Sequence, residues 1–244
     1  MKAILVNNDK SLSWSEVPDP VIKPDEVLVK IEAASLNRAD LMQRDGDYPP
    51  PDGCPEWMGL EISGEILKAG DAAKEKSDWK IGGKVCALLG GGGYAQYVSV
   101  KYDMLMPFPK NCSMVEAAAI PEAFATAYLN LFIEGKIKEG NTLLMHAGAR
   151  WIMIAALAGQ KTKIDLKNIC VGNVRIIGST LRSRTPGVKA QILSELTKNV
   201  FPKIEQGLVK PTIYKVLPIE QAEEAHAILQ NGQNVGKVVL TVNG

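Results

Sequence analysis

Short apolar runs separated by glycine and proline mark the first part of the chain. Their pattern predicts strands over residues 1–6, 27–31, 62–67, 84–89 and 94–100. Short strands with this punctuation are typical of a partly open β-barrel. We therefore expect residues 1 to about 110 to be rich in β-structure.

The pattern becomes helical in the centre of the chain. Ser113 is followed three residues later by Glu116, which is the spacing of a capping box. A short helix is expected from there to about residue 120, ending before Pro121. Pro121 suits the first position of a second helix, which should run to residue 132 and close at Gly135.

The last part of the chain mixes helices and strands. Apolar residues recur every fourth position over residues 186–206, which predicts a helix. Pro202 should kink this helix and Gly207 should end it. A second amphipathic helix is expected over residues 219–229. Further strands are expected at residues 141–147, 150–158, 174–177 and 237–242, and composition marks the first two of them as buried.

Composition indicates an ordinary globular protein. The 244 residues carry a formal net charge of +1, and 46% of them are hydrophobic and 23% charged. Nearly balanced charge without a dense basic run argues against a nucleic-acid surface. No apolar run reaches the length of a membrane span, and polar residues at positions 7–9 stop the first apolar run too early for a signal peptide.

The cysteines indicate reduced thiols and therefore a cytoplasmic protein. None of them forms a C-x-x-C pair, and neither histidine lies near one, so zinc-ligand spacing is absent. A disulfide framework is the less favoured interpretation. The cysteines are Cys54, Cys86, Cys112 and Cys170.

A glycine run at residues 90–93 imitates a nucleotide-binding motif. With Tyr94 and Ala95 it contains the string G-x-G-x-x-A after an apolar strand. A dinucleotide fingerprint has to open a helix, whereas a strand is expected here over the residues that follow. The glycines are therefore interpreted as a tight loop beside a cavity.

Five motifs occur in order along nearly the whole chain: ASLNRADLMQRDGDYPPP, LLGGGGYAQYV, AAAIPEAFATAYLNLF, IIGSTLRSR and NVGKVVL. Together they resemble the zinc-independent quinone oxidoreductase branch, related to zeta-crystallin, of the medium-chain dehydrogenase/reductase superfamily. The resemblance implies an α/β fold. A GroES-like, partly open β-barrel domain would span residues 1–120, a truncated Rossmann-type nucleotide-binding remnant residues 121–210, and a segment returning to the GroES-like domain residues 211–244.

The resemblance also implies an enzyme without zinc. Alcohol dehydrogenases of the superfamily place a metal-binding cysteine where Asn37 stands and a metal-binding histidine where Leu60 stands. Asparagine is a poor zinc ligand and leucine is none. The implied activity is an NADPH-dependent reduction of a quinone, or of an activated enone or carbonyl. Such an enzyme needs no protein nucleophile, because the nicotinamide supplies the hydride.

Three residues are implied to face the substrate. The Asn37 amide would hydrogen-bond the acceptor carbonyl or the cofactor, and the Tyr48 phenol would donate to a quinone oxygen as negative charge develops there. The alternative is that Asn37 holds a turn and Tyr48 packs on the neighbouring prolines. Asp40 would either pair with Arg38 or Arg44, or cap the following helical turn.

The remaining candidate residues belong to a cofactor site. Arg182 or Arg184 would grip phosphate with a guanidinium fork, or lie on a solvated basic loop. His146 and His226 are interpreted as structural. The cofactor contacts that the resemblance implies are Thr126, Gly148, Leu157, Gly159, Leu181, Arg182, Asn234 and Lys237.

The chain departs from the family after Ala149. Residues 143–149 begin the glycine-rich motif of a nucleotide domain, but residues 150–159 resemble a late strand of the same domain. At about 30 residues for each βαβ unit, some three units are missing. The pyrophosphate anchor would be among them. Losing three or four hydrogen bonds to charged groups, at roughly 1.5–3 kcal/mol each, would weaken cofactor binding about a thousand-fold or more.

The join at residues 148–150 is too short for a parallel crossover. The second strand would reverse into a hairpin, exchange partners with another chain, or be poorly ordered. A non-catalytic deletion variant that pairs with an intact relative is therefore an alternative to the enzyme, and an enoyl-thioester reductase is a weaker one. The expected partners are a small-molecule quinone or enone and a second chain, in a homodimer or with a full-length relative.

Overall fold

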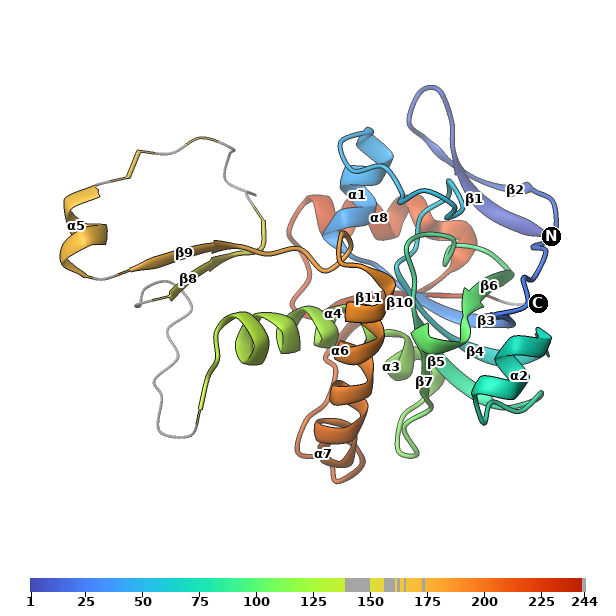
Figure 1. Ribbon diagram of the computed structural model, residues 1–244. Coiled ribbons are helices and arrows are strands. Elements are labelled where there is room, and N and C mark those ends of the chain that lie inside the picture. The colour runs from blue at the N-terminus through green and yellow to red at the C-terminus, as the bar shows by residue number, and fades with distance from the viewer. Residues whose placement is uncertain (139–149, 156–160, 162, 165, 173, 243–244) are drawn as a thin grey trace.

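The computed structural model describes residues 1–138, 150–155, 161, 163–164, 166–172 and 174–242 (Figure 1). The strands are β1 (Lys2–Val6), β2 (Leu12–Glu16), β3 (Glu26–Ser35), β4 (Glu61–Ala69), β5 (Lys84–Leu88), β6 (Tyr97–Lys101), β7 (Leu105–Pro107), β8 (Arg150–Met153), β9 (Arg175–Gly178), β10 (Ile213–Pro218) and β11 (Lys237–Thr241). The α-helices are α1 (Arg38–Asp45), α2 (Asp71–Lys76), α3 (Met114–Ala118), α4 (Pro121–Tyr128), α5 (Leu166–Val171), α6 (Pro186–Asn199), α7 (Phe201–Glu205) and α8 (Ala222–Gln230). Short helical turns are η1 (Tyr102–Met104), η2 (Leu129–Glu134) and η3 (Ile219–Gln221).

One large sheet organises the body of the molecule. Its strands follow the order β10-β11-β3-β4-β5-β7, and β6 pairs with the first half of β3. The last strands of the chain join the first ones, because β11 runs antiparallel to β3 with Val239 opposite Ser35. The expected strands of the first 110 residues are therefore confirmed, and the C-terminal segment returns to their sheet.

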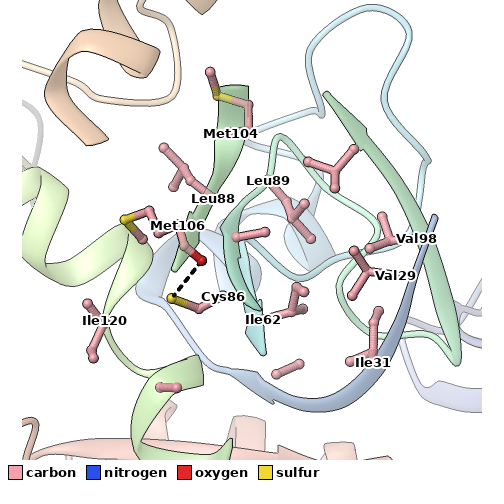
Figure 2. Packing of buried hydrophobic residues seen from close by; sticks show 14 of the residues in the cluster. Val29, Ile31, Ile62, Cys86, Leu88, Leu89, Val98, Met104, Met106 and Ile120 are labelled. Carbon is pink, nitrogen blue, oxygen red and sulfur yellow. Dashed lines mark hydrogen bonds between the residues drawn. The ribbon is translucent and has the colours of Figure 1, made fainter. Parts of the chain in front are cut away.

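The core lies inside the curve of this sheet. Val29 and Ile31 of β3 and Ile62 of β4 are fully buried, as the alternation of a one-sided sheet requires. Figure 2 shows Val29 and Ile31 next to Val98 on one side of β5, and Cys86 next to Met106 and Ile120 on the other. Burial raises the pKa of the Cys86 thiol, so this cysteine is a neutral packing group.

The central helices begin where the sequence predicts. Ser113 caps α3, and its hydroxyl and backbone exchange hydrogen bonds with Glu116. Pro121 opens α4, which continues as the π-helical turn η2 up to Gly135. The start of α3 is capped locally by Ser113 and Glu116, whereas the first turn of α4 is marked by its proline and its Glu122 N–H is bound by the distant Glu61.

The expected helix over residues 186–206 is present in two pieces. Pro186 opens α6. The helix is interrupted at Val200, because Pro202 lies in the first turn of α7 and cannot continue the preceding helix. Gly207 follows with a positive φ of 74°. The helix over residues 219–229 is confirmed as η3 followed by α8. No helix in these described ranges is long and apolar enough to cross a membrane.

The β8–α5–β9 unit, called the arm from here on, projects away from the body (Figure 1). Strands β8 and β9 pair in parallel, with Trp151 opposite Ile176. The expectation of a buried strand over residues 150–158 is wrong for its described part. The side chains of Trp151 and Ile154 are 42% and 56% exposed, because two strands alone cannot cover their own faces. The expected strand at 141–147 and the join at 148–149 lie outside the described residues.

Candidate active site

A polar cluster lies where four segments of the body meet, with Asn37 and Glu61 buried and Glu122 and Lys237 partly buried. Asn37 follows β3 as the N-cap of α1, and Glu61 is the first residue of β4. Lys237 is the first residue of β11, and Glu122 stands in the first turn of α4. The ends of these elements bring together residues that are up to 200 positions apart in the sequence.

Lys237 is the cation of this cluster. Its Nζ lies 2.6 Å from Glu61 Oε1 and donates to Asn37 Oδ1 at 2.7 Å. The Asn37 Nδ2 donates in turn to Glu61 Oε1 at 3.0 Å. Glu61 is fully buried, so this ion pair is screened from water and each charge depends on the other.

Glu122 is a second acid beside Glu61. Its backbone N–H donates to Glu61 Oε2 at 2.9 Å, and its own Oε1 accepts the Thr126 hydroxyl at 2.9 Å. Burial and the charge of Glu61 raise the pKa of Glu122 to about 7. The side chain therefore changes its charge near neutral pH.

Asp40 caps the first helix and is fully buried. Its carboxylate accepts the backbone N–H of Asn37 at 2.7 Å and that of Gly59 at 3.0 Å. Burial outweighs these bonds and raises the pKa of Asp40 to about 6. Of the two alternatives for Asp40, the structure has capping: Arg38 donates to the Leu229 carbonyl, and Arg44 pairs with Glu223.

The Arg182 guanidinium lies over the Tyr48 ring at the edge of the site. Its guanidinium lies 4.7 Å from the centre of the Tyr48 ring and donates to the Tyr48 carbonyl at 3.1 Å. Its Nη2 also donates to Gln43 Oε1 and to the Gly90 carbonyl, each at 2.7 Å. Arg184 pairs with Glu134 at 2.6 Å. Protein groups thus engage both of the guanidinium groups that the sequence suggested for phosphate.

The glycine run at residues 90–93 is a loop, and β6 follows it as a strand. This confirms that it is not a dinucleotide fingerprint. The glycines allow the loop to touch the proline-rich segment: a Cβ on Gly90 would lie 2.5 Å from Cys54 Sγ. Gly59, with a φ of 103°, makes a similarly close approach to Gly93.

The other predicted site residues are more scattered. Thr126 joins the polar cluster through Glu122, Leu181 is buried next to Arg182, and Asn234 donates to the Gly236 carbonyl at 2.7 Å. His226 is fully buried against Tyr94, and burial lowers its pKa to about 4. The candidates outside the described residues are His146, Gly148, Leu157 and Gly159.

Sequence reasoning missed two members of the cluster, Glu61 and Glu122. Each reads alone as a surface acid. A signal was present for Glu61, which stands between Leu60 and Ile62, directly before the strand predicted over residues 62–67. Glu122 follows a helix-opening proline, where an acid is usually explained by the helix dipole.

Two domain profiles match the chain in sequence order. The alcohol dehydrogenase GroES-like domain matches residues 23–110, and the zinc-binding dehydrogenase domain matches residues 140–240. The chain belongs to the medium-chain dehydrogenase/reductase superfamily. The described body carries the whole GroES-like match, and the second match includes the arm, α6, α7 and the returning strands.

Relatives within this superfamily include reductases and a vesicle protein. The zebrafish (Danio rerio) synaptic vesicle membrane protein VAT-1 homolog is 36% identical over 60% of the chain and 30% of its own length. The chloroplastic quinone-oxidoreductase homolog of spinach (Spinacia oleracea) is 36% identical over 54% of the chain and 42% of its own length. The 2-methylene-furan-3-one reductase of tomato (Solanum lycopersicum) is 28% identical over 93% of the chain and 74% of its own length. The chain thus matches less than half the length of the first two.

Solved structures of the superfamily share the fold. An NAD-dependent alcohol dehydrogenase superposes with a TM-score of 0.81 over the whole of both chains, at 21% identity. The quinone oxidoreductase of Coxiella burnetii gives a TM-score of 0.72, at 21% identity, over all of this chain and 99% of that one. At these identities the likeness concerns the fold alone.

Proposed function

We propose that the chain is a zinc-independent, NADPH-dependent reductase of quinones or activated enones and carbonyls. The observation that carries this proposal is the buried Asn37–Glu61–Lys237 cluster, which lies in the GroES-like body beside Tyr48 and Arg182. The likeness to quinone oxidoreductase and enone reductase sequences supports the same class of reaction.

The residues of the cluster do not suit zinc. Leu60 offers no ligand, and the Lys237 ammonium already lies between Asn37 Oδ1 and Glu61 Oε1. A metal ion there would face a positive charge at hydrogen-bond distance. Within the described residues, moreover, no group of three or more histidine, cysteine or acidic side chains could hold a metal.

The residues beside the cluster suit the nicotinamide end of a cofactor. Asn130 Oδ1 and Ser179 Oγ are buried without a hydrogen-bond partner, so both can bind polar groups of a ligand. Thr126 lies one turn before Asn130 on the same helical stretch. When bound, the reduced cofactor supplies a hydride.

The chain's own residues would orient and polarise the acceptor. Asn37 is fixed by Lys237 and Glu61, and its second amide hydrogen makes only a 3.5 Å contact with the Ser35 carbonyl. An acceptor oxygen would replace this long contact. Tyr48 is held by Arg182 stacked on its ring, which leaves its phenol to donate to developing negative charge.

A partner-dependent variant of this enzyme is the second candidate, and the arm favours it. Leu166 and Val171 of α5 are 71% and 74% exposed, in addition to the apolar side chains of β8. Exposed apolar surface of this kind marks interaction sites. The alignment with the tomato reductase spans 288 positions, more than the 244 residues of the chain, so the relative has residues that face gaps here. We therefore propose an internal deletion and pairing with a second copy or with an intact relative.

The test is a fluorescence titration of the purified chain with NADPH and, in parallel, NADH, followed by turnover of a quinone. Saturation at micromolar NADPH and quinone reduction are expected. The absence of binding at millimolar NADPH, both alone and with an intact relative, would overturn the proposal. An enoyl thioester as a second acceptor distinguishes the weaker alternative, which requires preferential reduction of the thioester.

A further inference from the structure

Charge is unbalanced in the buried cluster. The carboxyl groups of Glu61 and, more weakly, Asp40 act electrostatically on that of Glu122. Lys237 is the ammonium that bears on them, and it pairs directly with Glu61. A buried carboxylate without a counter-ion is costly and takes up a proton instead. The cluster therefore holds a proton at neutral pH.

Hydrogen bonds show which group holds this proton. Glu61 accepts three donors, the Lys237 ammonium, the Asn37 amide and the Glu122 N–H. Asp40 accepts two backbone N–H groups. Glu122 has the weakest support, since the described contacts give its carboxyl a single donor, the Thr126 hydroxyl.

We propose that Glu122 stores the proton that reduction of the acceptor consumes and delivers it through the Thr126 hydroxyl. This inference rests on the proposed function. The acceptor gains a hydride from a reduced nicotinamide. The proton of the Glu122 carboxyl passes to Thr126 Oγ1 as the Thr126 hydroxyl hydrogen passes to the acceptor oxygen. Glu122 is left as a carboxylate, and a proton from water restores it.

The surroundings of Glu122 suit this task. Glu61 on β4 and Asp40 on α1 favour its protonated form, whereas Lys237 on β11 limits the cost of the carboxylate. Glu122 acts electrostatically on the Tyr48 phenol, which is the group proposed to donate to the acceptor. A carboxyl that changes charge close to the working pH is a good proton donor.

The other elements packed on α4 add little charge. The Cys86 thiol on β5 is neutral. Lys189 on α6 donates to the Arg182 carbonyl at 2.6 Å, away from Glu122. Burial is the largest cause of the raised pKa of Glu122, and Glu61 and Lys237 are the main charged groups that act on it, so variants of these two residues should move that pKa in opposite directions.

The store is tested without cofactor, by NMR titration of protein labelled with ¹³C at the glutamate carboxyls. One signal should titrate near pH 7 and be missing from Glu122→Gln. Its midpoint should fall in Glu61→Gln and rise in Lys237→Met. If Glu122→Gln fails to fold, Thr126→Val identifies the same signal by raising its midpoint. If Glu122 is already ionised at about pH 5, the proposal that it stores a proton at neutral pH is overturned.

The delivery is tested by quinone turnover. Glu122→Gln and Thr126→Val should each lower kcat about 100-fold or more with little change in KM, whereas Thr126→Ser should retain turnover. Glu75→Gln, which changes an exposed acid on α2, is the matched control and should match the parent. An unchanged kcat and pH profile in Glu122→Gln would overturn the delivery. If the parent shows no turnover although Glu122 titrates near pH 7, the proposed function fails and the store stands.

Discussion

The body and the arm of this chain differ in which side chains they bury. In the body, even charged side chains are enclosed: Asp40 and Glu61 are fully buried and hydrogen-bonded. In the arm, apolar side chains such as Trp151 and Leu166 face solvent. The body thus carries the hydrophobic core and the polar site, and the arm depends on some other surface to cover it.

This difference separates the GroES-like part, which carries the polar cluster, from the arm, which lies in the second domain match. The polar cluster needs β3, β4, β11 and α4, and the structure holds all four in place. The parallel pair β8 and β9 would normally lie inside a larger sheet covered on both faces. If the proposed function holds, the polar cluster supplies the acceptor side of the site and a partner would act at the arm.

The largest effect is expected from removing the cation of the cluster. Lys237→Met leaves Glu61 buried without the ammonium that lies 2.6 Å away. Breaking such a pair costs about 3–5 kcal/mol of unfolding free energy, to be measured by denaturant titration. The control is Lys215→Met, which breaks the exposed pair with Glu224 and should cost about 1 kcal/mol or less. Equal losses in both variants would contradict a body stabilised by its buried cluster.

A pair of truncations compares the body with the arm directly. Ile62→Ala removes a fully buried side chain and should lower the free energy of unfolding by about 2–5 kcal/mol. Leu166→Ala removes a side chain that is 71% exposed, and its effect should stay within about 0.5 kcal/mol. A large loss in Leu166→Ala would mean that the arm is packed after all.

The pH dependence of stability provides a third test. Burial lowers the pKa of His226 from its usual 6.5 to about 4, so the unfolded chain binds a proton in this window before the folded chain does. His226 therefore costs the folded protein stability as the pH falls from about 6.5 to about 4, by up to about 3 kcal/mol.

His226→Leu should remove that loss in denaturant titrations repeated across the window. Asp40 acts in the other direction, because its pKa is raised from 3.8 to about 6 and the folded state takes up its proton first. Asp40 is common to both proteins, so the difference between parent and variant isolates His226. Parallel curves for the two proteins would refute a buried neutral histidine.

The smallest effect concerns the edge of the site. Arg182→Lys keeps the charge but loses the stacked fork that joins Tyr48, Gln43 and Gly90. We expect a loss of about 1–2 kcal/mol and faster hydrogen exchange in residues 43–52. Arg184→Lys, with a partly exposed pair to Glu134, should change neither. Unchanged exchange in Arg182→Lys would show that the fork does not hold Tyr48.

Local signals in the sequence predicted the frame well. The capping box at Ser113 is satisfied within three residues, and the prolines at 121 and 186 open helices because their fixed φ suits the first turn. These signals can be read from the local sequence, and so can the loop at the glycine run of residues 90–93, although its contacts with residues 54–59 depend on the tertiary fold. The strands of the body follow from their apolar runs in the same way.

The site itself could be predicted only in part. Asn37, Tyr48, Asp40 and Lys237 were named through a family resemblance, but their partners depend on contacts between distant segments. Lys237 reaches Asn37 across 200 positions, and nothing local marks Glu61 or Glu122 as its neighbours. The expectation of a buried strand over residues 150–158 was wrong for a different reason. The composition of this segment suits burial, but no larger sheet covers it within the described residues.

The most direct test of the contrast between body and arm is hydrogen–deuterium exchange of the whole chain, with and without NADPH. We predict slow exchange in β3, β4 and β11 under both conditions and fast exchange in β8 and β9 without a partner. NADPH should slow exchange in α4 and in residues 178–184, where Thr126, Ser179 and Arg182 lie. Fast exchange in β3 and β4, or no change in α4 at millimolar NADPH, would contradict a preformed reductase site in the body.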